Sequence, residues 1–143
     1  MDKYKRGWII PAIIIVINAC AIWIRWSSLP VTLPAHFDPQ GNASGTIART
    51  TLLFYPLISL MTCIIAYGAS VAVRRTPQRA DNSGLRLLGL HSLTSAIALT
   101  ILSSTMVTLT FGTMPLFMFA EPVIMVIGIT IFIFCLVKAR RNG

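Results

Sequence analysis

The chain has 143 residues, of which 55% are hydrophobic and only 11% are charged, and its formal net charge is +8 at pH 7. Soluble globular domains carry about 25% charged residues, so this composition excludes an ordinary soluble protein. The apolar residues are gathered into long runs, which indicates a membrane protein. We therefore interpret the positive charge as a signal of membrane orientation, and we do not expect a nucleic-acid-binding protein.

The apolar runs have about the length that a helix needs to cross the ~30 Å hydrocarbon core of a bilayer. In lipid every backbone amide must find an internal partner, which favours helices. The sequence predicts an all-α membrane protein with a single membrane domain over residues 1–143. Its four transmembrane helices form a bundle and cover about 7–28, 50–73, 85–111 and 117–137, and a structured outer loop, 29–49, joins the first two.

Basic residues are concentrated at one set of helix ends. Ten of the twelve lie there: Lys3, Lys5, Arg6, Arg74, Arg75, Arg79, Arg86, Lys138, Arg140 and Arg141. Only Arg25 and Arg49 fall on the other side. The positive-inside rule assigns the basic side to the cytoplasm. We therefore predict that both termini are cytoplasmic and that the loop 29–49 faces outward.

The third expected helix carries a small or hydroxylated residue at every fourth position, namely Ser92, Ala96, Thr100, Ser104 and Thr108. In lipid, small residues at this spacing let a neighbouring helix approach closely, and hydroxyls can hydrogen-bond across the contact. The stripe predicts a packing face, with a path for a polar solute as the alternative. Asn18, near the middle of the first helix, is expected to hydrogen-bond to another helix, near Thr100.

The chain offers little for metal, cofactor or catalytic chemistry. Cys20, Cys63 and Cys135 belong to different helices at different depths, so we interpret them as core thiols. The sequence contains no zinc-protease or serine-hydrolase motif and no paired catalytic carboxylates, and His36 with Asp38 is too small a constellation. We expect a non-enzymatic protein that needs no metal and no cofactor.

The ionisable residues of the outer side form a second pattern. Glu121 is expected in the first turn of the fourth helix, just before Pro122, where an acid favours the helix dipole. The helix directions place it on the same side as four other ionisable residues, Arg25, His36, Asp38 and Arg49. We predict one cluster in which Asp38 or Glu121 pairs with Arg25 or Arg49. The cluster is either a structural ion-pair network or a site for a charged partner.

The outer loop is longer than a simple connection, since helix–helix connections commonly take about 2 to 8 residues. Pro30 and Pro34 favour an extended exit from the first helix. The stretch "FDPQGNASG", residues 37–45, supplies turn residues, with Asp38 at the start of a turn. Phe37 is expected to anchor the loop on the helix ends. These features predict a folded cap with a binding role.

The stretch "SLPVTLPAHFDPQGNASGTIAR", residues 28–49, resembles the signature of a bacterial integral membrane protein family that includes the SdpI-type immunity proteins. The matching positions are Leu29, Pro30, Pro34, His36, Phe37, Gly41 and Gly45. The chain departs from the pattern at Asp38, Ser44 and Arg49, where the family has Asn, Asp and Lys. The resemblance covers about the first 70 residues. It implies a multi-helix protein of the bacterial inner membrane that gives resistance to a toxic peptide, with some members signalling to a cytoplasmic repressor.

Three classes of function follow from these observations. The first is a protein of the immunity or signalling type, whose outer loop binds a peptide or a membrane-protein partner. Its binding residues would be His36, Phe37, Asp38, Arg49, Arg25 and Glu121. The second is an accessory or transport subunit of a larger membrane complex, and the third, with least support, is an intramembrane enzyme. Besides the lipid bilayer, the partners left open include a second copy of the chain.

Overall fold

The computed structural model describes residues 6–38, 42–75, 80–111, 113 and 115–141. Its helices are α1 (Ile9–Arg25), α2 (Phe54–Arg75), α3 (Ala80–Leu109) and α4 (Pro115–Arg141). Short 3-10 segments flank α1 and precede α2, at Arg6–Trp8, Trp26–Ser28 and Arg49–Leu53. Two strands, β1 (Thr32–Phe37) and β2 (Ala43–Ala48), lie between α1 and α2.

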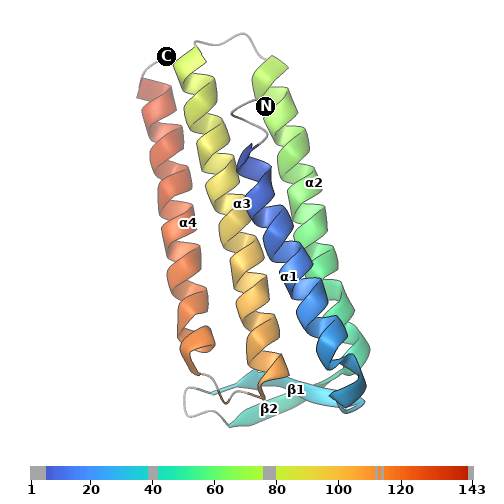
Figure 1. The fold of residues 1–143 in the computed structure, drawn as a ribbon. Helices are drawn as coiled ribbons and strands as arrows, with labels where there is room; N and C mark the ends of the chain where they lie inside the picture. The colour runs from blue at the N-terminus through green and yellow to red at the C-terminus, as the bar shows by residue number, and fades with distance from the viewer. Residues whose placement is uncertain (1–5, 39–41, 76–79, 112, 114, 142–143) are drawn as a thin grey trace.

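Four helical segments are long and apolar enough to cross a membrane, which confirms the predicted all-α membrane fold. Because the number of spans is even, the start of α1 and the end of α4 lie at one end of the bundle, and the strands lie across the other (Figure 1). We call these the basic end and the hairpin end. Helix α3 begins before its predicted span of 85–111 and α4 extends beyond its predicted span of 117–137 at both ends, because hydropathy marks only the apolar part of a helix.

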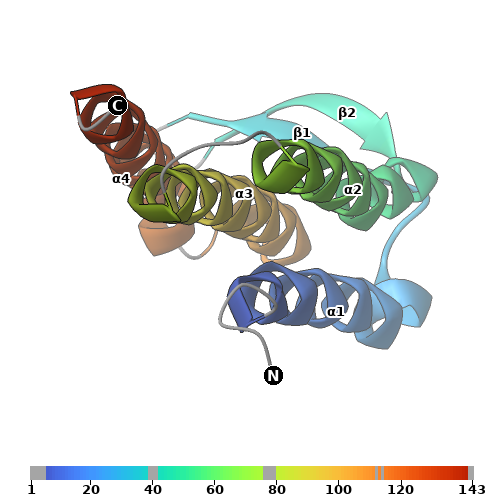
Figure 2. The same ribbon diagram turned by 90° about the horizontal axis from the view of Figure 1, so that it is seen from above.

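The central element is α3 (Figures 1 and 2). Both α1 and α2 pack on α3 and on each other, whereas α4 packs chiefly on α3. The bundle is therefore a three-helix group with α4 attached to one side of α3, and differs from a square arrangement in which every helix has two equal neighbours. The interface between α3 and α4 is the most extensive between any two helices.

The predicted stripe on α3 faces α4. A Cβ added at Gly128 of α4 would clash with the side chain of Ala96, so the two helices approach closely at this point. Further along, Ser104 contacts Glu121 of α4. The hydroxyl of Thr100 donates to the carbonyl of Ala96 in its own helix, at 2.9 Å. These contacts support the packing interpretation of the stripe.

The distribution of polarity is the reverse of that in a soluble protein. Large apolar side chains such as Ile24 and Leu116 are 75% exposed, as expected for groups that contact lipid. Small polar side chains are buried among the helices: Asn18, Ser59, Ser70, Thr94, Ser103, Thr105 and Thr108. Asn18 is only 1% exposed, and neither atom of its amide has a hydrogen-bond partner among the described residues. The predicted bond from Asn18 to another helix is therefore wrong.

The outer loop folds as an antiparallel β-hairpin, where the sequence predicted only an extended exit and turns. Its register pairs Thr32 with Ala48 at one end and Phe37 with Ala43 at the other. Gly45 has a φ of +69°, a left-handed conformation that favours glycine. We did not expect strands here because proline and glycine are usually depleted in them.

The hairpin is attached to the bundle by the buried side chain of Leu33. Leu33 is fully buried, in a cluster with Leu52 and other apolar side chains from the helix ends. The remaining members of this cluster are Ile22, Leu29 and Leu109. Phe37 is only partly buried and lies further along β1. Leu33 is thus the buried anchor of the hairpin, and the anchoring role expected of Phe37 stays a prediction.

Candidate functional site

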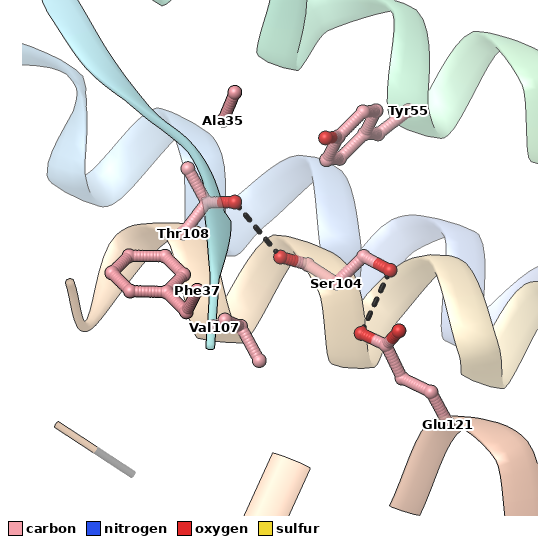
Figure 3. Close-up of a pocket in the computed structure, with 7 residues that line it drawn as sticks. All are labelled: Ala35, Phe37, Tyr55, Ser104, Val107, Thr108 and Glu121. Atoms are coloured by element: carbon pink, nitrogen blue, oxygen red, sulfur yellow. Dashed lines mark hydrogen bonds between the residues drawn. The ribbon is translucent and has the colours of Figure 1, made fainter. Parts of the chain in front are cut away.

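A pocket of about 360 Å³ lies at the hairpin end, between β1 and the ends of α2, α3 and α4. We call it the hairpin pocket. Its lining consists of Ala35, Phe37, Tyr55, Ser104, Val107, Thr108 and Glu121. The volume lies within the range of about 300–1,000 Å³ that is typical of small-molecule sites. Figure 3 shows Ser104 and Thr108 on α3, Glu121 reaching from α4 toward Ser104, and Phe37 on β1.

Glu121 is oriented by α3. The hydroxyl of Ser104 donates a hydrogen bond of 2.8 Å to Oε1 of Glu121 (Figure 3). Because α4 begins at Pro115, Glu121 lies six residues further on, and the first turn of α4 contains no acidic residue. The predicted position in the first turn is therefore wrong, since the helix starts earlier than hydropathy indicated. The carboxylate of Glu121 is therefore held in place by a side chain of the neighbouring helix α3.

The pocket is rich in acceptors and poor in donors. The hydroxyl hydrogen of Ser104 is used in the bond to Glu121, and the hydroxyl of Thr108 donates to the backbone carbonyl of Ser104 at 3.0 Å. Both hydroxyl oxygens keep acceptor capacity, and so does the second oxygen of the carboxylate. Only the hydroxyl of Tyr55 can supply a further donor from these side chains. The pocket is therefore suited to a ligand that brings its own donors.

The two arginines of the hairpin end, Arg25 and Arg49, donate hydrogen bonds to backbone carbonyls. Arg25 Nη2 donates to the carbonyl of Leu109 at 3.5 Å. Arg49 Nη1 donates to the carbonyls of Leu29 and Trp26 at 3.1 and 3.4 Å, and its guanidinium lies 4.8 Å from the centroid of the Trp26 ring. In the described part of the chain, the predicted pairing of Glu121 with an arginine is therefore not formed. These arginines fasten the loop and the helix ends.

Asp38 stabilises the hairpin turn and does not line the pocket. Its carboxylate oxygens accept hydrogen bonds from the backbone N–H and the side-chain amide of Asn42, both at 2.8 Å. This contact confirms that Asp38 begins a turn. His36 pairs with Ser44 in the strand register, and its side chain lies outside the described part of the structure.

Of the six residues predicted for the site, the pocket brings together Phe37 and Glu121. It adds Tyr55, Ser104 and Thr108, which the prediction did not assign to a site. Ser104 and Thr108 belong to the four-residue stripe that we interpreted from the sequence as a packing face. The hydroxyls at the outer end of that stripe were the feature that could have indicated a polar pocket. Tyr55 carried no such signal, because a tyrosine at the start of an apolar run is common at membrane interfaces.

Comparison with protein families shows that residues 13–60 match the model of a domain of unknown function, DUF1648. Comparison with curated proteins and comparison with solved structures gave no match. The matched region covers most of α1, the hairpin and the beginning of α2, so it contributes Phe37 and Tyr55 to the pocket. Ser104 and Glu121 lie beyond it. The chain is thus an all-α membrane protein with four candidate spans, of which residues 13–60 match DUF1648.

Proposed function

We propose that this chain is a non-enzymatic, SdpI-like protein of the bacterial inner membrane that binds a peptide or a membrane-protein partner in the hairpin pocket. In this proposal both termini are cytoplasmic and the pocket opens at the outer surface. The orientation is supported by the basic residues that end α2 and α4, Arg74, Arg75, Lys138, Arg140 and Arg141, which lie opposite the hairpin. The role is of the immunity or signalling type.

One observation carries the proposal: the loop is folded over a pocket that contains an oriented carboxylate. A connection between two helices needs neither a hairpin nor a pocket. In a chain with four acidic residues, Glu121 is placed at a helix interface and bonded to Ser104. Intramembrane ionisable residues are costly, and they commonly mark functional sites. The described lining holds one carboxylate and no histidine or cysteine, so we propose binding rather than catalysis.

The accessory-subunit function remains the second candidate. It is favoured by the position of α4, which packs chiefly on α3 and leaves large apolar side chains such as Phe119, Val126 and Phe134 exposed. A larger membrane protein could cover that face, as could a second copy of the chain. The two candidates predict different critical residues, since one depends on the hairpin pocket and the other on the outer face of α4.

The test is a protection assay. Bacteria that produce the protein are exposed to membrane-active peptides secreted by neighbouring cells, and their survival is measured. We expect Phe37→Ala and Glu121→Gln to lose protection while their melting temperatures and membrane levels stay near those of the wild type. Val31→Ala is a matched control, because Val31 is 75% exposed and lies outside the pocket. Protection that survives both pocket substitutions contradicts the proposal. Loss of function on substitution of Phe134 alone favours the accessory subunit.

A further inference from the structure

The side chains of the hairpin pocket select the chemical class of the ligand. Glu121 is the only charged side chain of the described lining, so a bound cation would be favoured over an anion. Arg25 and Arg49 do not line the pocket, and their guanidinium groups bond the carbonyls of Leu109, Leu29 and Trp26. The described lining therefore offers no basic side chain to bind a phosphate or a carboxylate.

The hydrogen-bond donors and acceptors that the lining side chains have left narrow the chemical class of the ligand further. The hydrogens of Ser104 and Thr108 are used within the protein, whereas their oxygens and the second carboxylate oxygen of Glu121 can still accept. An ammonium group has three donors and no acceptor, so it complements this arrangement. The rings of Phe37 and Tyr55 complete the lining, and aromatic faces attract ammonium groups.

Two other cations fit less well. Hard divalent metal ions prefer several carboxylate or carbonyl ligands, and among the described residues no three His, Cys, Asp or Glu side chains are grouped for metal binding. A guanidinium group binds a carboxylate best through two parallel hydrogen bonds. Because Oε1 of Glu121 already accepts a hydrogen bond from Ser104, a guanidinium would have to share that oxygen to make both bonds, whereas an ammonium can bond through the second oxygen alone.

We infer that the hairpin pocket binds a primary ammonium group of a peptide, with Glu121 as its counter-ion and the Ser104 and Thr108 oxygens as further acceptors. The inference rests on the proposed function, because it names the ligand of the same pocket. The headgroup of phosphatidylethanolamine also carries an ammonium. That lipid would place its phosphate beside a lining without a basic side chain, so the observations favour the peptide.

The experiment uses the full-length protein in phosphatidylcholine nanodiscs and three probes of equal backbone: the N-acetyl methylamides of lysine, norleucine and arginine. Binding is measured by calorimetry. We expect the lysine probe to bind more tightly than the norleucine probe by about tenfold or more, the scale of a charge-assisted hydrogen bond. Glu121→Gln should remove this difference, while its amide oxygen can still accept from Ser104 and maintain the fold. Val31→Ala changes an exposed side chain outside the pocket and should leave the preference intact.

Equal binding of lysine and norleucine probes, or a stronger arginine probe, overturns the inference. It is also overturned if phosphatidylethanolamine in the nanodisc abolishes lysine binding in a Glu121-dependent manner, because the ligand is then a lipid. Failure of the proposed function gives a different result. In that case the probe preference depends on Glu121, but neither Phe37→Ala nor Glu121→Gln changes protection of cells.

Discussion

The hydroxyl of Ser104 on α3 donates a 2.8 Å hydrogen bond to the carboxylate of Glu121 on α4. This bond joins the two helices that share the largest interface of the bundle, and it lies beside the hairpin pocket. The bond therefore joins two helices and also holds a carboxylate that lines the pocket.

Ser104→Ala tests the structural contribution of this bond. We expect the free energy of unfolding to fall by about 1 kcal/mol, because interhelical hydrogen bonds in membranes are worth roughly this amount. The measurement is a denaturant or thermal unfolding curve in detergent. Thr130→Val is the matched control, since the hydroxyl of Thr130 donates to Val126 in its own helix and its side chain is exposed. Equal stability of Ser104→Ala and wild type would refute a structural contribution.

Gly128→Ala tests the close approach of α3 and α4. The added Cβ would clash with that of Ala96, so we expect a loss of about 1 to 3 kcal/mol in stability, the usual cost of overpacking. Gly68→Ala is the control, because a Cβ there meets no atom within 4 Å and should be neutral or slightly stabilising.

The double variant Gly128→Ala with Ala96→Gly separates packing from backbone effects. Removing the Cβ of Ala96 should recover most of the stability lost by Gly128→Ala, because the clash involves these two atoms. Additive losses in the double variant would show that Gly128 acts through its own helix and not through α3.

Asn18→Leu tests the cost of an unpartnered amide in the core. Leaving a buried polar group unsatisfied costs about 1–3 kcal/mol, and a leucine of similar size removes that cost. We therefore expect a higher melting temperature for Asn18→Leu. Ser59→Ala, which removes a buried hydroxyl that also has no partner among the described residues, should not lower stability. A lower melting temperature for Asn18→Leu would mean that the amide has a partner in the membrane.

Arg49→Ala tests the attachment of the hairpin. The guanidinium bonds the carbonyls of Leu29 and Trp26 and stacks on the Trp26 ring, so its loss should lower stability by about 1–2 kcal/mol. Arg49→Lys should be intermediate, because an ammonium keeps the charge but loses the planar fork. Thermal unfolding monitored by tryptophan fluorescence measures both, and wild-type stability of Arg49→Ala would argue against a fastening role.

Membrane orientation is tested with cysteine labelling in a background without Cys20, Cys63 and Cys135. A cysteine at Ser44, which is exposed on β2, should react in whole cells with a membrane-impermeant thiol reagent. A cysteine at Gln78, between α2 and α3 and outside the described residues, should react only after the cells are broken. The opposite pattern would reverse the proposed topology.

The sequence by itself determined the fold class and the number of spans. Runs of apolar residues long enough for a bilayer leave the backbone no alternative to helices, so the four spans follow from composition and length alone. The turn at Asp38 was also predictable, because the side chain of Asp38 bonds a residue four positions away. The packing face of α3 could be read from the four-residue period of Ser92, Ala96, Thr100, Ser104 and Thr108.

The partners of individual side chains were decided by the tertiary structure. Arg25 and Arg49 donate to backbone carbonyls in the part of the chain that the structure describes, since the helix ends place Leu29 and Leu109 within their reach. Leu33 anchors the hairpin because strand pairing directs it into the apolar cluster, which no local pattern indicates. The pocket is lined by residues of β1, α2, α3 and α4, which are distant in sequence. Contacts between such distant segments depend on how the helices pack, and the local sequence around each residue does not specify them.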